Sequence, residues 1–246
     1  MSAKDVLLGK NSSGARHVVL LDPDKLNPES AAVASTKCSK AGVDALFVGG
    51  STGDRTAFAN IIGIIKKNSK IPVILFPGSF EQIVPETDAV LFMSLLSGRN
   101  PRFLIEEQVK GAGLVKKYGL ETIAMGYLLI ESDKPSAVEK VSGTKPIPRN
   151  DIESAVNHAL AAQYFGMDVV YLEGGSGVGL SVPNEMVKAV KTAIDIPLIV
   201  GGGIRSPGEA REKVVAGADI IVTGNVLEEK GMDRMLADLV TEIHAC

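Results

Sequence analysis

The sequence predicts a single (β/α)8 barrel that occupies residues 1–246. Eight short segments are almost continuously apolar, as parallel strands are when both faces are buried. Amphipathic segments separate most of them, and this alternation is typical of a parallel sheet with helices between its strands. Two apolar segments near the C-terminus end in glycines, as expected of the phosphate-binding loops after strands 7 and 8 of such a barrel. A chain of 246 residues, 45% of them hydrophobic, is long enough for one barrel core.

The expected strands and helices follow one another along the whole chain. The strands cover residues 17–22, 44–49, 72–76, 88–92, 122–130, 168–173, 197–201 and 219–223. The helices include residues 30–41, 55–67, 102–117, 151–165, 183–193 and 207–216. Eight parallel strands are enough to close a barrel, and an open doubly wound sheet is the alternative.

An internal repeat supports closure. The segment 42–51, GVDALFVGGS, resembles the segment 166–176, GMDVVYLEGGS. Each is followed by a similar strand, IPVIL at 71–75 or IPLIV at 196–200. A repeat over about half the chain suggests two related half-barrels, and an open sheet does not explain this spacing.

The connection after the third strand is too short for a helix. Only residues 77–87, PGSFEQIVPET, separate the third and fourth strands, and they include two prolines and a glycine. A parallel crossover usually needs about a dozen residues or more. We therefore expect a short loop in place of the third helix, which would leave an apolar trench on the barrel flank. The alternative is a loop that a neighbouring subunit covers.

Composition and charge exclude several classes of protein. The net charge of −3 gives no basis for nucleic-acid binding, and no Lys/Arg-rich run points to an anionic membrane. No segment resembles a signal peptide or is apolar for long enough to cross a bilayer. Cys38 and Cys246 are far apart and lack metal-ligand spacing, as expected in a reducing compartment. We expect a soluble, cytoplasmic protein with no nucleic-acid partner and no stable membrane insertion.

The glycines near the C-terminus predict a phosphate site. They lie in the segments 196–205, IPLIVGGGIR, and 217–225, GADIIVTGN, each of which places glycine between a strand and a helix. Glycine lets backbone N–H groups approach an anion closely, and a helix N-terminus adds the positive end of its dipole. Two ordinary turns are the alternative, but two such units in succession favour a phosphorylated small molecule as the ligand.

Polar side chains at the C-terminal ends of strands are the candidates for chemistry. Asp22 follows the first strand and Ser51 the second, and their oxygens suit Mg²⁺, which completes its shell with water and substrate phosphates. The alternative for Asp22 is a capping role in the turn at Pro23. Tyr171 and Glu173 share one side of the sixth strand, which we expect to face inward. Glu173 is the candidate general base, and the alternative is a rim residue paired with Lys or Arg.

The sequence offers no group for covalent catalysis at a strand end. His17 lies at the start of a strand, His158 in an expected helix and His244 near the C-terminus, and neither cysteine follows a strand. We therefore expect the chemistry to depend on metal, carboxylate and backbone N–H groups.

Seven motifs carry a likeness to a known family. They are LDPDK at 21–25, GGS at 49–51, RNP at 99–101, KPIPR at 145–149, YLEGGSG at 171–177, GGGIRS at 201–206 and TGN at 223–225. Together they resemble the archaeal branch of the geranylgeranylglyceryl/heptaprenylglyceryl phosphate synthase family. The glycine motifs are common in phosphate-binding barrels, whereas the combination of DPDK with YLEGGSG is specific.

The resemblance implies a prenyltransferase of archaeal membrane lipid synthesis. It would join the C3 hydroxyl of sn-glycerol 1-phosphate to the geranylgeranyl group of geranylgeranyl diphosphate by an ether bond. Asp22 and Ser51 would bind Mg²⁺ as the cofactor, and Glu173 and Tyr171 would be catalytic. The residues that would bind glycerol phosphate are Tyr171, Leu172, Glu173, Gly174, Gly175, Ser176, Gly177, Gly202, Gly203, Gly224 and Asn225. The trench would bury the prenyl chain, with roughly 0.8 kcal/mol for each CH₂.

Two positions depart from the family's pattern. Leu20 stands where the bacterial branch has lysine, which favours the archaeal branch. Gly174 stands where many archaeal members have alanine, and we expect little effect from it.

Two other functions and the assembly stay open at this point. A sugar-phosphate isomerase would share the phosphate site, but it needs a second carboxylate where the fifth strand offers Met125, Tyr127 and Leu129. A non-catalytic phosphate-binding barrel would need neither the metal residues nor the trench. We expect a homo-oligomer, because Gly111, Gly113 and the apolar segment 103–115 could pack against a partner subunit.

Overall fold

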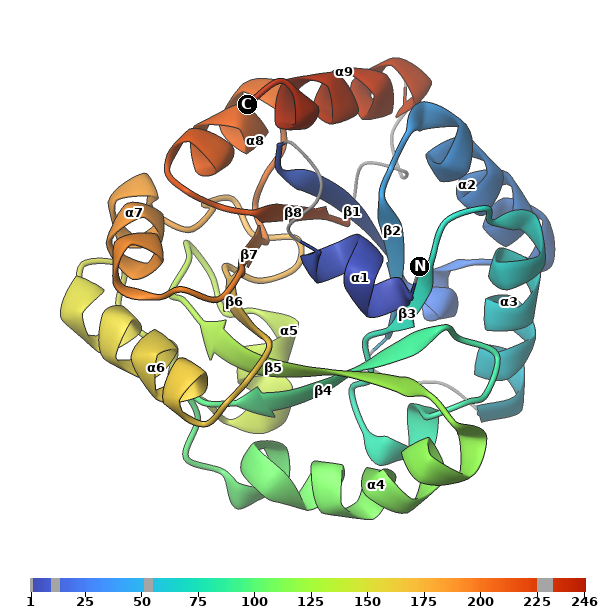
Figure 1. Ribbon diagram of the computed structural model, residues 1–246, viewed down its shortest axis with the longest axis horizontal. Coiled ribbons are helices and arrows are strands. Elements are labelled where there is room, and N and C mark those ends of the chain that lie inside the picture. The colour runs from blue at the N-terminus through green and yellow to red at the C-terminus, as the bar shows by residue number, and fades with distance from the viewer. Residues whose placement is uncertain (1, 10–13, 51–54, 225–231) are drawn as a thin grey trace.

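Eight parallel strands form a closed barrel, in which each strand pairs with the next and β8 pairs with β1 (Figure 1). The computed structural model describes residues 2–9, 14–50, 55–224 and 232–246. The strands are β1 Arg16–Leu21, β2 Ala45–Val48, β3 Val73–Leu75, β4 Ala89–Leu95, β5 Glu121–Leu129, β6 Val169–Glu173, β7 Leu198–Gly201 and β8 Ile220–Thr223. The barrel prediction is confirmed, and the open sheet is wrong because the pairing of β1 with β8 closes it.

The largest difference from the expected strands is at β4. This strand continues to Leu95, three residues beyond the expected end, because its residues pair with β5 as far as Tyr127. With this length, β4 ends opposite Tyr127, two residues before the end of β5.

A ring of helices surrounds the barrel (Figure 1). It consists of α2 Pro28–Ala41, α3 Arg55–Asn68, α4 Glu107–Tyr118, α6 Ile152–Tyr164, α7 Asn184–Ala193, α8 Pro207–Val215 and α9 Met232–His244. Each helix can bury one side against the outward residues of the strands because its apolar residues recur every three to four positions. In α6, for example, Ala155, Ala159 and Ala162 are buried.

The connection between β3 and β4 holds a single 3₁₀ turn, η2 Phe80–Gln82, and no α-helix, which confirms the expected short loop. The next connection packs closely against it. A Cβ atom on Gly111 of α4 would lie 2.6 Å from Ile83 Cδ1. Gly111 therefore serves a contact within its own chain, so it does not support the subunit contact that we expected from the sequence.

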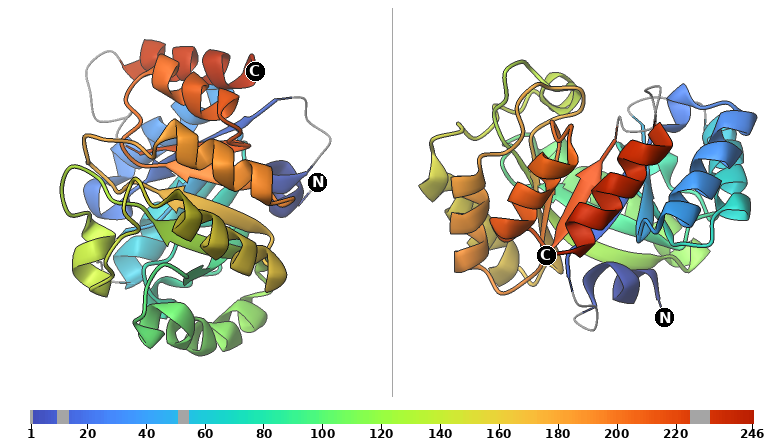
Figure 2. Two further views of the ribbon diagram at one scale, coloured as in Figure 1. Left: turned by 90° about the vertical axis from the view of Figure 1, so that its left-hand side faces the viewer. Right: turned by 90° about the horizontal axis from the view of Figure 1, so that it is seen from above.

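Two short helices were not expected. α1 Ala3–Leu8 crosses the N-terminal end of the barrel (Figures 1 and 2). Its Leu7 is fully buried in the same apolar cluster as the barrel-interior residues Val18 and Ile123. α5 Ala137–Ser142 lies in the long connection between β5 and α6. No helix in the described parts of the chain is long and apolar enough to cross a membrane.

Four aspartates at the N-terminal end tie the strands together in pairs. Each precedes an even-numbered strand, and its carboxylate accepts a hydrogen bond from a backbone N–H of the strand before it. The bonds are His17 N to Asp44, Val73 N to Asp88, Ala124 N to Asp168 and Leu198 N to Asp219, at 2.7–2.9 Å. The same carboxylates pair with His244, Lys66, Lys4 and Lys191. Polar contacts thus fix the N-terminal end of the barrel, whereas the cavity lies at the C-terminal end.

Candidate active site

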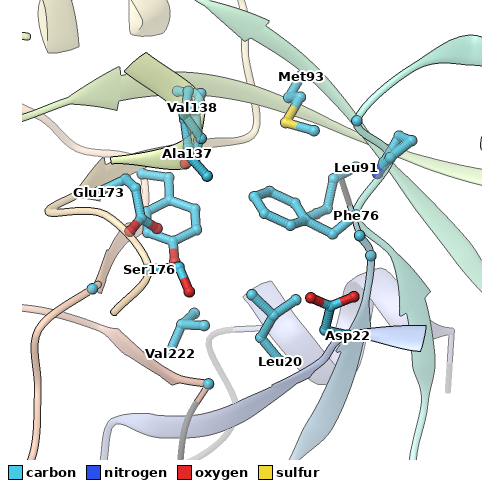
Figure 3. Close-up of a pocket in the computed structure, with 18 of the residues that line it drawn as sticks. Leu20, Asp22, Phe76, Leu91, Met93, Ala137, Val138, Glu173, Ser176 and Val222 are labelled. Atoms are coloured by element: carbon cyan, nitrogen blue, oxygen red, sulfur yellow. The ribbon is translucent and has the colours of Figure 1, made fainter. Parts of the chain in front are cut away.

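A cavity of about 1280 Å³ opens at the C-terminal ends of the strands. Figure 3 shows Asp22 and Glu173 on opposite sides of it, with Phe76 and Leu20 between them. The cavity continues past Phe80, Ile83, Phe92, Met93 and Phe103, beside the connection that lacks a helix. It therefore combines a polar mouth with an apolar extension, as the expected trench requires.

Glu173 is the buried acid of the cavity. It ends β6, is only 6% exposed, and its Oε1 accepts a hydrogen bond of 2.5 Å from the N–H of Gly175. The hydroxyl groups of Tyr171 and Tyr127 also lie within hydrogen-bonding reach of its carboxylate. The inward orientation expected for Tyr171 and Glu173 is confirmed, because both line the cavity.

The environment of Glu173 changes its acidity. Burial raises the pKa of its carboxyl above the usual range, although hydrogen bonds from Tyr171, Gly175 and Tyr127 oppose the shift. A carboxylate with a raised pKa accepts a proton more readily than an exposed one, which suits a general base. Burial also raises the pKa values of the Tyr171 and Tyr127 hydroxyls, which keeps both as hydrogen-bond donors.

Tyr127 is a site residue that the sequence reasoning missed. It pairs in register with Tyr171, their ring centroids are 5.3 Å apart, and Phe76 packs against both rings. The available signal was its position, two residues from Met125 and Leu129 on the inner side of β5. β5 thus faces Glu173 with a phenol and not with the second carboxylate that a sugar-phosphate isomerase needs.

The glycine loops meet beside Glu173. Gly202 has a φ of +80°, and a Cβ atom on it would overlap Glu173 Oε1 and the backbone of Gly175. Only glycine fits this position, because both the backbone conformation and the space exclude a side chain. Within the described chain, the N–H groups of Ser176, Gly177, Gly203 and Gly224 donate to no other protein group. These donors line the cavity and could receive phosphate oxygens.

Some predicted residues do not reach the cavity. Leu172 points outward into the apolar layer between the barrel and the helices, because successive residues of a strand alternate in direction. Gly174 donates its N–H to Gly201 O at 2.9 Å, so that this group is not free for a ligand. Ser51 and Asn225 lie outside the described residues. Asp22, Glu173, Tyr171, Gly175, Ser176, Gly177, Gly202, Gly203 and Gly224 all line the cavity.

Asp22 and Asp24 form an acidic pair on the other side of the mouth. A Cβ atom on Gly50 would lie 2.8 Å from Asp22 Oδ1 and 2.8 Å from Asp24 Oδ2, so both carboxylates lie against this glycine. Asp22 also caps η1 Pro23–Lys25 by accepting from Asp24 N at 3.1 Å. The alternative of a capping role is therefore realised for Asp22.

This donor set fits a hard cation that keeps part of its shell for substrate. Within the described ranges no group of three or more His, Cys, Asp or Glu side chains could hold a metal by itself. Mg²⁺ is often held by one or two carboxylates, with water and substrate phosphates as its other ligands. Asp24 does not itself line the cavity, but its carboxylate lies beside that of Asp22 at Gly50. Its position next to Gly50 depends on a contact between the loop after β1 and the loop after β2, which cannot be predicted from the sequence alone.

The histidines do not line the cavity. His17 is buried on the outward side of β1, where its Nε2 lies 2.8 Å from Thr223 Oγ1. His158 bonds to Ser154 within α6, and His244 pairs with Asp44. Arg99, from the RNP motif, donates to the carbonyl oxygens of Leu96 and Gly98 in its own loop.

Comparison with known proteins places this geometry in one family. The PcrB family profile matches residues 10–243. Geranylgeranylglyceryl phosphate synthase of Thermococcus kodakarensis is 48% identical over 229 residues, which are 93% of this chain and 90% of the relative. The synthase of Pyrococcus abyssi is 51% identical, over 89% of this chain and 86% of its own.

Two solved structures have nearly the same fold. One is (S)-3-O-geranylgeranylglyceryl phosphate synthase from Thermoplasma acidophilum in complex with its substrate sn-glycerol-1-phosphate. It has a TM-score of 0.94 and 39% identity, with all of both chains covered. The other, the wild-type synthase from Thermoplasma volcanium, has a TM-score of 0.94 and 36% identity, and covers 100% of this chain and 99% of its own.

Proposed function

The chain belongs to the PcrB family, and we propose that it catalyses the reaction for which its relatives are named. It transfers the geranylgeranyl group of geranylgeranyl diphosphate to the C3 hydroxyl of sn-glycerol 1-phosphate and releases diphosphate. The observation that carries this proposal is Glu173, a buried carboxylate between a glycine-rich mouth and an apolar trench. In archaea this reaction would form an ether bond of the membrane lipids.

Glu173 orients the acceptor and takes its proton. The C3 oxygen forms a bond to C1 of the prenyl group while the bond between C1 and the diphosphate oxygen breaks. The hydroxyl proton passes to the carboxylate of Glu173, whose pKa burial raises. Tyr171 and Tyr127 hold the carboxylate in place through their hydroxyls, and the closed packing of their rings keeps it out of bulk water.

The phosphate of the acceptor binds to backbone N–H groups of the loops after β6, β7 and β8. Ser176, Gly177, Gly203 and Gly224 supply donors there, and the absence of side chains on the glycines permits close approach. Gly202 contributes differently, because it lets the loop after β7 lie directly against Glu173. The acceptor's phosphate and its reacting hydroxyl are thereby held by adjacent groups.

The donor lies across the cavity with its prenyl chain in the trench. Phe80, Ile83, Phe92, Met93 and Phe103 provide the apolar surface. Asp22 and Ser51 would hold Mg²⁺ beside the diphosphate, and Asp24, which lies next to Asp22 at Gly50, would add negative charge nearby. The bound ion would supply positive charge that stabilises the departing diphosphate, so the chain itself needs no covalent nucleophile.

Assembly and cellular location are part of the same proposal. Ile105 is 56% exposed and Val109 67% exposed, and they form an apolar strip along η3 Arg102–Glu106 and α4 that suits a contact between copies of the chain. Both cysteines are free, which supports a reducing cytoplasm.

A direct assay tests the proposed function. Purified protein is incubated with sn-glycerol 1-phosphate, Mg²⁺ and prenyl diphosphates of several lengths, and the ether product and diphosphate are measured. We expect ether formation that requires both substrates and is lost with EDTA. Diphosphate release without ether, or no ether formation with any of the prenyl diphosphates, would contradict the proposal.

A further inference from the structure

Gln82 joins its own loop to the loop at Gly50, the glycine that contacts the acidic pair. It ends the 3₁₀ turn η2 and is 7% exposed. Its Nε2 donates to Gly50 O at 2.8 Å, and its Oε1 accepts from Gly78 N at 2.7 Å. The orientation of the amide is unambiguous, because a backbone carbonyl only accepts and a backbone N–H only donates.

The two loops that Gln82 joins are packed closely on each other. A Cβ atom on Gly78 would lie 3.0 Å from Gly50 O. On its other side, Gly50 touches the carboxylates of Asp22 and Asp24. The amide of Gln82 therefore fixes the distance between the loop after β3 and the loop after β2, in which Gly50 contacts the two carboxylates.

The same turn forms part of the trench wall. Phe80, the first residue of the turn, and Ile83, the residue after it, line the cavity. The N–H of Phe80 donates to Glu107 Oε2 of α4 at 2.9 Å, and Glu107 is held in turn by Arg102 at 2.7 Å. The turn is thus anchored to α4 at one point and to Gly50 at another.

We propose that Gln82 is a positioning residue for the prenyl diphosphate. Its amide sets the place of the loop at Gly50, where the diphosphate head would bind, relative to the trench wall, where the prenyl chain would lie. This inference rests on the proposed function, because it assigns the head of the donor to the acidic pair. The acceptor loops follow β6, β7 and β8, and their described residues form no hydrogen bond with Gln82, so the effect belongs to the donor alone.

The test replaces the amide while keeping its size. Gln82→Met removes both hydrogen bonds and leaves the Gly50 carbonyl and the Gly78 N–H without this partner. Both hydrogen bonds are made within the protein, so part of their loss lowers stability and the part that displaces the loop at Gly50 lowers affinity for the donor, by about tenfold. We expect the KM for geranylgeranyl diphosphate to rise about tenfold, while the KM for sn-glycerol 1-phosphate changes less than about twofold.

Gln163→Met is the matched control. Gln163 also joins two segments with both ends of its amide, since its Oε1 accepts from Asp195 N at 2.6 Å and its Nε2 donates to Asp195 Oδ2 at 3.2 Å. It does not line the cavity. Both variants should lose some thermal stability, but only Gln82→Met should change the KM for the donor. Gly78→Ala tests the contact between the same two loops, because its Cβ would press on Gly50 O, and should raise that KM by a smaller factor.

Calorimetry with inorganic diphosphate and Mg²⁺ separates this inference from the proposed function. We expect weaker diphosphate binding in Gln82→Met than in the wild type and in Gln163→Met, even if no ether is formed by any of them. A wild type that forms no ether would overturn the proposed function only. An unchanged donor KM with unchanged diphosphate binding in Gln82→Met, or equal rises in the KM values of both substrates, would overturn the role of Gln82.

Discussion

Single residues at the cavity are held by contacts that their sequence neighbours do not reveal. Tyr171 and Glu173 were predictable, because alternation on one strand puts them on the same side and the glycines after them mark the end of the strand. Tyr127, Asp24 and Gln82 were not, since each depends on which residue another loop or strand brings opposite to it. Leu172 was predicted to bind the substrate only because it lies within the YLEGGSG motif. The alternation of side chains along β6 points it outward, toward the surrounding helices.

Glu173→Gln should separate catalysis from stability. Loss of the base should lower kcat by roughly 10²–10⁴-fold. A carboxyl whose folded pKa is raised stabilises the fold at pH below its unfolded pKa and loses this stability as pH rises through the folded value. Glutamine does not ionise, so we expect the melting temperature of the variant to rise relative to that of the wild type as pH increases. Near-normal turnover, or a difference in melting temperature that does not change with pH, would argue against a buried base.

His17 makes the stability of the fold sensitive to acid. Burial, with the nearby His244 as a smaller cause, lowers the pKa of His17 to about 3, and its Nδ1 has no hydrogen-bond partner among the described residues. The unfolded chain therefore binds a proton below about pH 6.5 while the folded chain does not, and the free energy of unfolding falls by about 1.4 kcal/mol for each pH unit in that window. Urea unfolding of the wild type and His17→Gln at pH 7 and pH 5 measures this. The stability of the wild type relative to the variant should drop by about 2 kcal/mol between these values, whereas a constant difference would mean that His17 titrates normally.

At the scale of elements, most of the fold could be predicted from the hydrophobic runs and from the length of the loops. The eight apolar runs became strands, and residues 77–87 were too short for a helix, as the turn at Phe80–Gln82 confirms. The six-residue helices α1 and α5 were not predicted. A segment of that length has too few turns to show a helical pattern of apolar residues, and it is stabilised by packing. The aspartates before β2, β4, β6 and β8 were visible in the sequence as the first residues of four expected strands. Their common role appears only when the strand before each of them is placed beside it.

Asp88 tests these strand-pairing contacts. Asp88→Ala removes the acceptor for Val73 N and the partner of Lys66, whereas Asp88→Asn keeps an acceptor oxygen. We expect the alanine variant to lose about 1–3 kcal/mol of stability and the asparagine variant less, because the buried N–H is the costly group to leave unpaired. Urea unfolding gives the stabilities, and kcat should stay within about twofold because the N-terminal face of such a barrel serves stability. Equal losses in both variants would assign the effect to the ion pair.

The whole molecule is divided between its two ends. α1 and the four aspartates close the N-terminal end, and the cavity with its glycine loops and carboxylates occupies the other (Figure 2). The half-barrel repeat fits this division, since Asp44 and Asp168 hold equivalent positions in the two copies and make the same strand contact. Such a division predicts that substitutions at one end of the barrel do not affect the other end. The sequence alone did not indicate this division, because α1 was not predicted from it.

Leu7→Ala tests whether the ends are independent. Leu7 is fully buried where α1 meets the barrel interior, so its truncation should cost about 2–5 kcal/mol of stability. We expect the KM values of both substrates and kcat to remain close to those of the wild type at a temperature where the variant is folded, because the cavity lies at the far end. In the double variant with Glu173→Gln, the two changes in the free energy of unfolding should add to within about 0.5 kcal/mol, as they do for sites without shared partners. A larger deviation, or a loss of activity in folded Leu7→Ala, would show that packing through the barrel interior couples the N-terminal closure to the carboxylate that we assign as the base.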